Sequence, residues 1–136
     1  ITPPRDCASG PAALPHPILS SYATLRGYVT ICPGPRGAAS SFDPGVAGSD
    51  ATIGARESAT VGLKQNYSPM LDVSHDPRWG RISEGAGEDP YLGAAMARAQ
   101  VRGFQGTPDN TRLFMATPKH FAGAGASEGG RESGTA

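Results

Sequence analysis

The 136-residue chain is predicted to be an α/β protein with a parallel sheet. Two observations predict this class. A helical pattern over residues 44–64 leads into an apolar, strand-like run at 66–73, and a second helical pattern at 88–105 leads into another such run at 112–117. Functional groups in this architecture gather at the carboxyl ends of the strands. The polar residues that follow the two strand-like runs are therefore expected to face one crevice.

The first twenty residues differ in character from the rest of the chain. They contain five prolines and show no periodicity, so residues 1–20 are predicted to be an irregular amino-terminal segment. The stretch "CPGPRG" at 32–37 is predicted to be irregular for the same reason. Between them, "YATLRGYVTI" at 22–31 has the β-branched and aromatic content of a short strand. We expect the folded domain to begin at residue 21 and to include the remainder, 21–136.

The helix predicted over residues 44–64 has a recognisable start. Asp43 is suited to the N-cap position, and Pro44 suits the first helical position because its fixed φ and missing N–H cost nothing there. Three apolar side chains fall at roughly helical spacing: Val46, Ile53 and Val61. This spacing supports the helix over residues 44–64.

The second helix is predicted from Glu88 to Gln105. It has Leu92, Met96, Ala99 and Phe104 on one side, with Gly106 just past its end. Glu88 and Asp89 at its start, with Glu84 just upstream, could be interpreted as an acid/base pair of the glycosidase kind. The structural interpretation is favoured, because acidic residues at a helix start are stabilised by the N-terminal dipole.

Composition restricts the class of partner. Twelve basic and twelve acidic residues cancel, so the overall charge favours neither nucleic acid nor an anionic membrane. Cys7 and Cys32 allow one internal disulfide at most, and no paired metal-binding spacing occurs, so no metal or cofactor is expected. No apolar run approaches the roughly 20 residues of a membrane span. The expected partner is a small, uncharged molecule.

Two polar stretches follow the predicted strands: "SHDPRWGR" at 74–81 and "PKHF" at 118–121. Arg81, Lys119 and His120 all carry hydrogen-bond donors, and His120 can also accept. Such donors, brought together near an aromatic Trp79, suit a neutral polyhydroxylated ligand such as a sugar. These three polar residues are the predicted substrate-binding residues.

A structural interpretation of the same residues stays open. Arg78 and Arg81 could pair with Asp76, Glu84 or Glu88 and thereby fix the loop. His120 taken alone is more typical of a satisfied structural histidine. The glycine-rich "GAGASEGG" at 123–130 superficially resembles a dinucleotide-binding loop, but Glu128 takes the place of the third glycine and no helix is visible after it. A nucleotide-binding module is therefore disfavoured.

Three stretches together resemble one known family. "NYSPMLDVSHDPRWGRISEGAGEDPYL", "VRGFQG" and "KHFAGAGASEGGRESGT" are similar to the amino-terminal barrel domain of glycoside hydrolase family 3, specifically the bacterial periplasmic-type β-glucosidases. The upstream "GYVTICPGPRGAASSFDP" and "ARESATVGLK" match more loosely. The resemblance covers about residues 20–136 and is strongest from residue 66 onward.

This resemblance implies a (β/α)8, TIM-type barrel, present here only in part because a full barrel takes roughly 250 residues. It implies removal of terminal, non-reducing β-D-glucosyl residues with retention of configuration. It also implies that Arg81, Lys119 and His120 bind hydroxyls of that glucose. A retaining glycosidase needs a nucleophilic and an acid/base carboxyl group, and in this family both belong to segments after Ala136. The chain is thus expected to be an inactive fragment that works with the rest of a parent chain, periplasmic or secreted.

Several positions depart from the family pattern. Ala23 and Arg26 replace the aspartate and histidine of an Asp-x-x-His-Gly stretch, and Val29 replaces an arginine. Ala124, Ser133 and Gly134 replace bulkier groups. These departures motivate an alternative, a noncatalytic or degenerate carbohydrate-binding protein. Within the family, β-xylosidase and β-N-acetylglucosaminidase activities also stay open.

Overall fold

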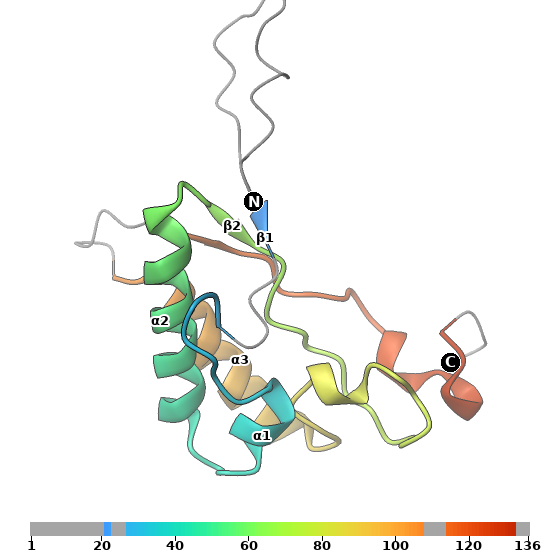
Figure 1. Ribbon diagram of the computed structural model, residues 1–136. Helices are drawn as coiled ribbons and strands as arrows, with labels where there is room; N and C mark the ends of the chain where they lie inside the picture. Colours follow the sequence, from blue (N-terminus) through green and yellow to red (C-terminus); the bar gives the residue numbers. More distant parts are fainter. Residues whose placement is uncertain (1–20, 23–26, 108–113, 133–136) are drawn as a thin grey trace, which may run out of the picture.

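The computed structural model describes residues 21–22, 27–107 and 114–132. Three short strands, β1 (Ser21–Tyr22), β2 (Gln65–Asn66) and β3 (Met115–Ala116), form a parallel sheet in the order β1-β2-β3. The helices are α1 (Pro35–Ala39), α2 (Pro44–Thr60) and α3 (Pro90–Gln105), with 3₁₀ turns η2 (Ile82–Glu84), η3 (Ala124–Ala126) and η4 (Glu128–Gly130). Figure 1 shows α2 and α3 side by side. The α/β class and the parallel pairing are as predicted, whereas residues 1–20 lie outside the described part.

Helix α2 begins where the sequence predicts and ends earlier. The Asp43 carboxylate accepts a hydrogen bond from the Gly45 backbone N–H at 2.7 Å, and Pro44 occupies the first helical position. The helix stops at Thr60 rather than at residue 64. Gly62, with a φ of +86°, takes a left-handed conformation that glycine adopts readily and that does not continue a right-handed helix.

Helix α3 begins two residues later than predicted. The Asp89 carboxylate accepts from the Tyr91 backbone N–H at 2.8 Å, which makes Asp89 the N-cap, with Pro90 at the first helical position. Gly106, with a φ of +70°, follows the last helical residue as expected. The carboxylate at this helix start is therefore a structural cap, in agreement with the favoured interpretation.

The face of α2 that packs on α3 carries small residues rather than large apolar ones. Ile53 and Val61 are exposed, by 36% and 53%, whereas the buried positions carry small residues: Ala47, Ala51, Gly54, Ala55 and Ser58. A β-carbon added at Gly103 of α3 would lie 2.4 Å from the Gly48 carbonyl oxygen. The two backbones therefore approach so closely that large apolar side chains are placed outside the contact.

The main apolar core joins this helical pair to β3. Ala51, Ala55, Phe104 and Phe114 form one buried cluster, in which the two phenylalanine rings have centroids 6.4 Å apart. A second cluster contains Ala39, Ala47 and Met96. Full burial of a phenylalanine side chain is worth about 1.5–3 kcal/mol. The phenylalanine pair thus fixes α3 against the strand that leads to the predicted "PKHF" site.

The strand predicted at 22–31 is wrong over its described carboxyl-terminal part. The backbone N–H groups of Val29 and Thr30 donate to the Glu57 carboxylate at 2.7 and 2.9 Å, so they are not available to a sheet. The Thr30 hydroxyl donates to the same carboxylate, and this hydrogen bond is the largest cause of the lowered pKa of Glu57. The segment is a loop attached to α2.

The stretch 32–37, predicted to be irregular, is partly helical. Helix α1 begins at Pro35, where the ring presets a helical φ, and it buries Ala38 and Ala39. Burial of these two small side chains supports a turn of helix that sequence periodicity could not show. Within the described part of the chain, no helix has the length and apolar character needed to cross a membrane.

Candidate functional site

The polar stretches at 74–81 and 118–121 come close together because the chain segments after β2 and β3 stay hydrogen-bonded to each other beyond the sheet. Beyond β2 and β3, the Thr117 N–H donates to the Ser68 carbonyl at 3.0 Å, and the Leu71 N–H donates to the Lys119 carbonyl at 2.5 Å. Met70 and Lys119 form a parallel bridge. In Figure 1 the segments after β2 and β3 leave the sheet together, on the side away from the carboxyl end of α2. Both stretches therefore meet at one end of the sheet, as the expectation of a shared crevice requires.

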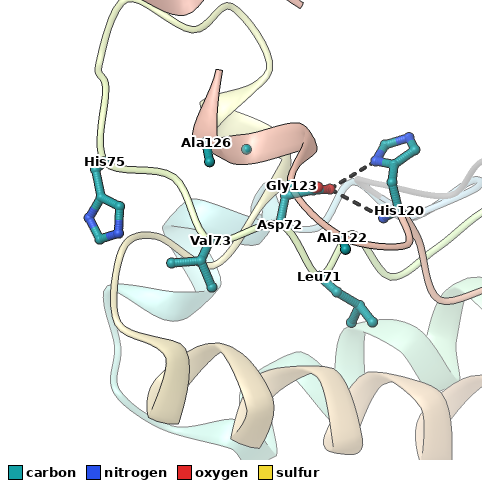
Figure 2. A pocket seen from close by; sticks show the side chains of 9 residues that line it. Leu71, Asp72, Val73, His75, His120, Ala122, Gly123 and Ala126 are labelled. Carbon is teal, nitrogen blue, oxygen red and sulfur yellow. Dashed lines mark hydrogen bonds and ion pairs between the residues drawn. The ribbon is translucent and has the colours of Figure 1, made fainter. Parts of the chain in front are cut away.

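His120 is held by a carboxylate that lies almost completely within the protein. The Asp72 side chain is 2% exposed, and its Oδ2 lies 2.8 Å from His120 Nδ1. The same oxygen accepts the backbone N–H of His120 at 3.4 Å, so that residues on two adjacent strand extensions are joined twice, as Figure 2 shows. The peptide bond between Lys119 and His120 is cis. The imidazole is 32% exposed and can meet a ligand.

Arg81 connects this pair to the loop that follows. Its Nη1 lies 3.3 Å from His120 Nε2, and its Nε and Nη2 donate to the two Glu84 carboxylate oxygens at 3.1 and 2.8 Å. Nη2 also lies 3.5 Å from the Met70 sulfur. The Glu132 carboxylate lies 3.7 Å from Nε. We call Met70, Asp72, Arg81, Glu84, Lys119 and His120 the polar cluster.

The charges of Arg81 and Glu84 in the polar cluster stabilise each other. Hydrogen bonding from the Arg81 guanidinium lowers the pKa of Glu84, and the charge of Lys119 lowers it further. The same hydrogen bond to Glu84 is the largest cause of the raised pKa of Arg81. Glu84 therefore stays ionised and acts as a fixed counter-ion. The paired carboxylate orients the guanidinium in a bidentate geometry.

The three residues predicted to bind substrate are placed unequally. Arg81 and His120 are in direct contact, whereas Lys119 joins the polar cluster through its strand bridge and its charge, and forms no side-chain hydrogen bond or ion pair with another described residue. The alternative interpretation, that Arg81 pairs with Glu84, is also confirmed. This pairing does not use all five N–H donors of the guanidinium, and substrate binding by Arg81 stays a prediction.

The neighbouring arginine has a different role. Arg78 donates to Asp76 through its side chain at 2.7 Å and its backbone N–H at 2.9 Å, which closes the turn around Pro77. The Arg78 hydrogen bond lowers the pKa of Asp76 to about 2. Trp79 is 1% exposed, so the predicted aromatic neighbour of a sugar is instead a packed interior residue. Its indole fixes the loop from within and offers no face for stacking.

Sequence reasoning missed Asp72. A signal was available, because Asp72 is a carboxylate within an otherwise apolar run at 66–73, two positions after Met70. Residues two apart in an extended strand lie on one face. The structure places Met70 against Arg81 and Asp72 against His120, in agreement with that alternation.

The glycine-rich segment serves close packing. A β-carbon at Gly125 would lie 2.6 Å from the Val73 carbonyl oxygen, and one at Gly130 would lie 2.6 Å from the Arg78 carbonyl oxygen. Gly130 also has a φ of +76°, which favours glycine. These glycines let the segment lie against the backbone of the loop at 72–79. This packing gives the glycines a role other than phosphate binding.

A pocket of about 420 Å³ adjoins the polar cluster. Its lining combines the Asp72–His120 pair with small and apolar side chains, including Leu71, Val73 and Ala122, which surround the hollow in Figure 2. Arg81 and Lys119 are not among the lining residues. Among the residues that the structure describes, no group of three histidine, cysteine, aspartate or glutamate side chains could hold a metal ion.

Fold and site together define an α/β protein with a hydrogen-bonding site at the carboxyl ends of parallel strands. The sequence profile described as "Glycosyl hydrolase family 3 N terminal domain" matches residues 6–136. The chain belongs to this family, in agreement with the resemblance seen in its motifs.

Known relatives are considerably longer than this chain. It is 42% identical to the "Periplasmic beta-glucosidase" of Salmonella typhimurium over 96% of its own length and 17% of the relative's. It is 41% identical to a "Beta-xylosidase" of Formosa agariphila over 71% of its length and 14% of the relative's. The Listeria innocua β-glucosidase, solved in complex with glucose, is 38% identical with a TM-score of 0.80, over 85% of this chain and 16% of that one. The chain thus spans about one-sixth of such proteins.

Proposed function

We propose that this chain is part of a retaining β-glucosidase that acts on terminal, non-reducing β-D-glucosyl residues. In this proposal Arg81, Lys119 and His120 bind hydroxyl groups of the glucose. The Asp72–His120–Arg81–Glu84 hydrogen-bond chain is the observation that carries it, since it holds a guanidinium and an imidazole together at strand ends. Glycosidases named β-glucosidase among the relatives support the same substrate.

The chemical step requires groups beyond those of the polar cluster. A retaining enzyme needs two carboxyl groups about 5 Å apart across the glycosidic bond. In the polar cluster, Glu84 is committed to Arg81 and Asp72 to His120, so neither is free to attack a sugar. We propose that the nucleophile and the acid/base belong to the remainder of a parent chain. The three-stranded sheet would then be one part of a (β/α)8 barrel.

The first experiment separates binding from turnover. The purified chain is expected to bind glucose, measured by calorimetry, and to leave an aryl β-glucoside unhydrolysed. Arg81→Lys should weaken binding by about tenfold or more, because a single ammonium cannot replace the bidentate guanidinium. Arg78→Lys is the matched control and should bind as the original chain does, since Arg78 lies outside the polar cluster.

Two results would contradict these proposals. Turnover by the chain alone would place the catalytic carboxylates within it. Equal glucose affinity in the Arg81 and Arg78 variants would remove Arg81 from the sugar site.

The 41% identical relative named β-xylosidase supports xylose as a second candidate. Xylose lacks the exocyclic hydroxymethyl group of glucose, so a comparison of the two affinities decides between them. Because two relatives are named periplasmic, we also propose an exported parent protein. Signal-dependent export of the full-length parent would test that localisation, and retention in the cytoplasm would contradict it.

A further inference from the structure

The hydrogen bonds of the polar cluster have a defined direction. Arginine is always protonated and can only donate, so His120 Nε2 must accept from Arg81 Nη1 at 3.3 Å. The opposite ring atom, Nδ1, then carries the proton and donates to Asp72 at 2.8 Å. In this arrangement the ring proton lies on the side of the buried carboxylate.

Asp72 is placed to impose this state. Its side chain is 2% exposed, and one oxygen accepts both the ring and the backbone N–H of His120. An ionised carboxylate has no proton to donate, so it cannot support the opposite tautomer, in which Nδ1 would itself need a donor. A carboxylate that orients a histidine ring in this way fixes its tautomer.

We propose that Asp72 is a positioning residue that holds His120 in the Nδ1–H tautomer and presents Nε2 to the ligand as a hydrogen-bond acceptor. This inference rests on the proposed function, sugar binding at the polar cluster. A sugar hydroxyl can replace Arg81 as the donor to Nε2 and can accept from Arg81 or Lys119 at the same time.

The same arrangement selects against anionic ligands. An ionised carboxylate or phosphate group has no proton for Nε2, so in an anionic sugar only the remaining hydroxyls can donate to it. Asp72, Glu84 and Glu132 place three negative charges near Arg81, against the two positive charges of Arg81 and Lys119, so an anionic ligand meets a net negative site. The substrate class that fits is a neutral sugar, and a uronic acid is expected to bind more weakly.

The tautomer is measured directly by long-range ¹H–¹⁵N correlation of the imidazole rings in the ¹⁵N-labelled full chain at slightly alkaline pH. His120 is assigned from the resonances that disappear in His120→Asn. The expected spectrum shows a protonated Nδ1 and an unprotonated Nε2. A predominantly Nε2–H ring in the original chain would overturn the proposal.

Two variants test the role of Asp72 itself. Asp72→Leu, which keeps the approximate volume without an acceptor, should lower the Nδ1–H fraction of His120 strongly, and Asp72→Asn should lower it less. An unchanged fraction overturns the proposal, and if the leucine variant does not fold, the asparagine variant decides. Glu88→Gln is the matched control, because Glu88 lies 3.9 Å from His75 on the surface and its loss should leave His120 unaffected.

Ligand preference provides the second readout. The original chain should bind glucose about tenfold or more tightly than glucuronate, and this ratio should fall in Asp72→Asn. A ratio that is the same in both proteins would overturn the selective role of Asp72. If the original chain binds neither sugar, the proposed function fails, whereas the tautomer measurement still decides whether Asp72 positions His120.

Discussion

The contact between α2 and α3 and the polar cluster hold their residues by different means. The backbones of the two helices approach each other closely, for example at Gly103 and the Gly48 carbonyl group. Small side chains fill the remaining space. In the polar cluster, long side chains connect segments whose backbones are further apart. The Arg81 side chain contacts both Glu84 and His120. The helix contact requires residues with little or no side chain, whereas the polar cluster requires charged side chains.

This difference determines how each region should respond to change. Close apolar packing loses stability when volume is added or removed, and it does so at every pH. Ion pairs at a partly exposed site contribute little to stability, and their contribution depends on ionisation. The helical pair should therefore dominate folding, whereas the polar cluster should dominate ligand selection. The following predictions test that division, from the largest expected effect to the smallest.

Phe114→Ala should have the largest effect on stability. Phe114 is 2% exposed and packs against Phe104, and removal of such a ring typically costs about 3–5 kcal/mol. Phe121→Ala is the matched control, since Phe121 is fully exposed and its loss should change the free energy of unfolding by less than about 0.5 kcal/mol. Urea denaturation measures both, and similar costs would contradict the assigned core.

Gly103→Ala should destabilise the chain by about 1–3 kcal/mol, because the added methyl group would overlap the Gly48 carbonyl and the Ala51 side chain. Gly93→Ala in the same helix is the control. Its new methyl group meets nothing within 4 Å, so it should stabilise the chain by up to about 1 kcal/mol through helix propensity. If both variants are stabilised, the α2–α3 contact is looser than described.

Asp76→Asn should have the smallest effect, and that effect should depend on pH. Folding lowers the pKa of Asp76 from 3.8 to about 2, so the ionised carboxylate stabilises the folded state fully above pH 3.8. This contribution is lost as the pH falls towards 2. The stability difference between the original chain and the variant should shrink over that interval. The cost of Gly103→Ala, in contrast, should stay constant, and a constant Asp76→Asn difference would contradict the ion pair.

Local signals made helices α2 and α3 predictable. Asp43, Pro44 and Gly106 act within one turn of chain, so their positions could be predicted without knowledge of the fold. The buried face of α2 could not be predicted, because Ile53 and Val61 satisfy a periodic pattern equally well whether or not a neighbouring backbone excludes them. The distance between two packed helices depends on both of them, whereas the spacing of apolar residues describes one helix alone.

The site shows the same division. Arg81 and His120 could be predicted from residue type and from their place after strands, and the structure brings them into contact. Trp79 was misassigned because aromatic residues occur both in sugar sites and in interiors, and only the fold distinguishes the two. Asp72 was missed because its role depends on a partner 48 positions away in the sequence.

Gly125 and Gly130 make the geometry of the polar cluster sensitive to positions that carry no functional group. A methyl group at either position would act as a spacer between the carboxyl-terminal segment and the loop at 72–79. That spacing would move Glu132 relative to Arg81 and His120 relative to Asp72. Variants at these glycines could therefore alter sugar affinity while every polar side chain is retained, so a survey of functional groups alone would overlook them.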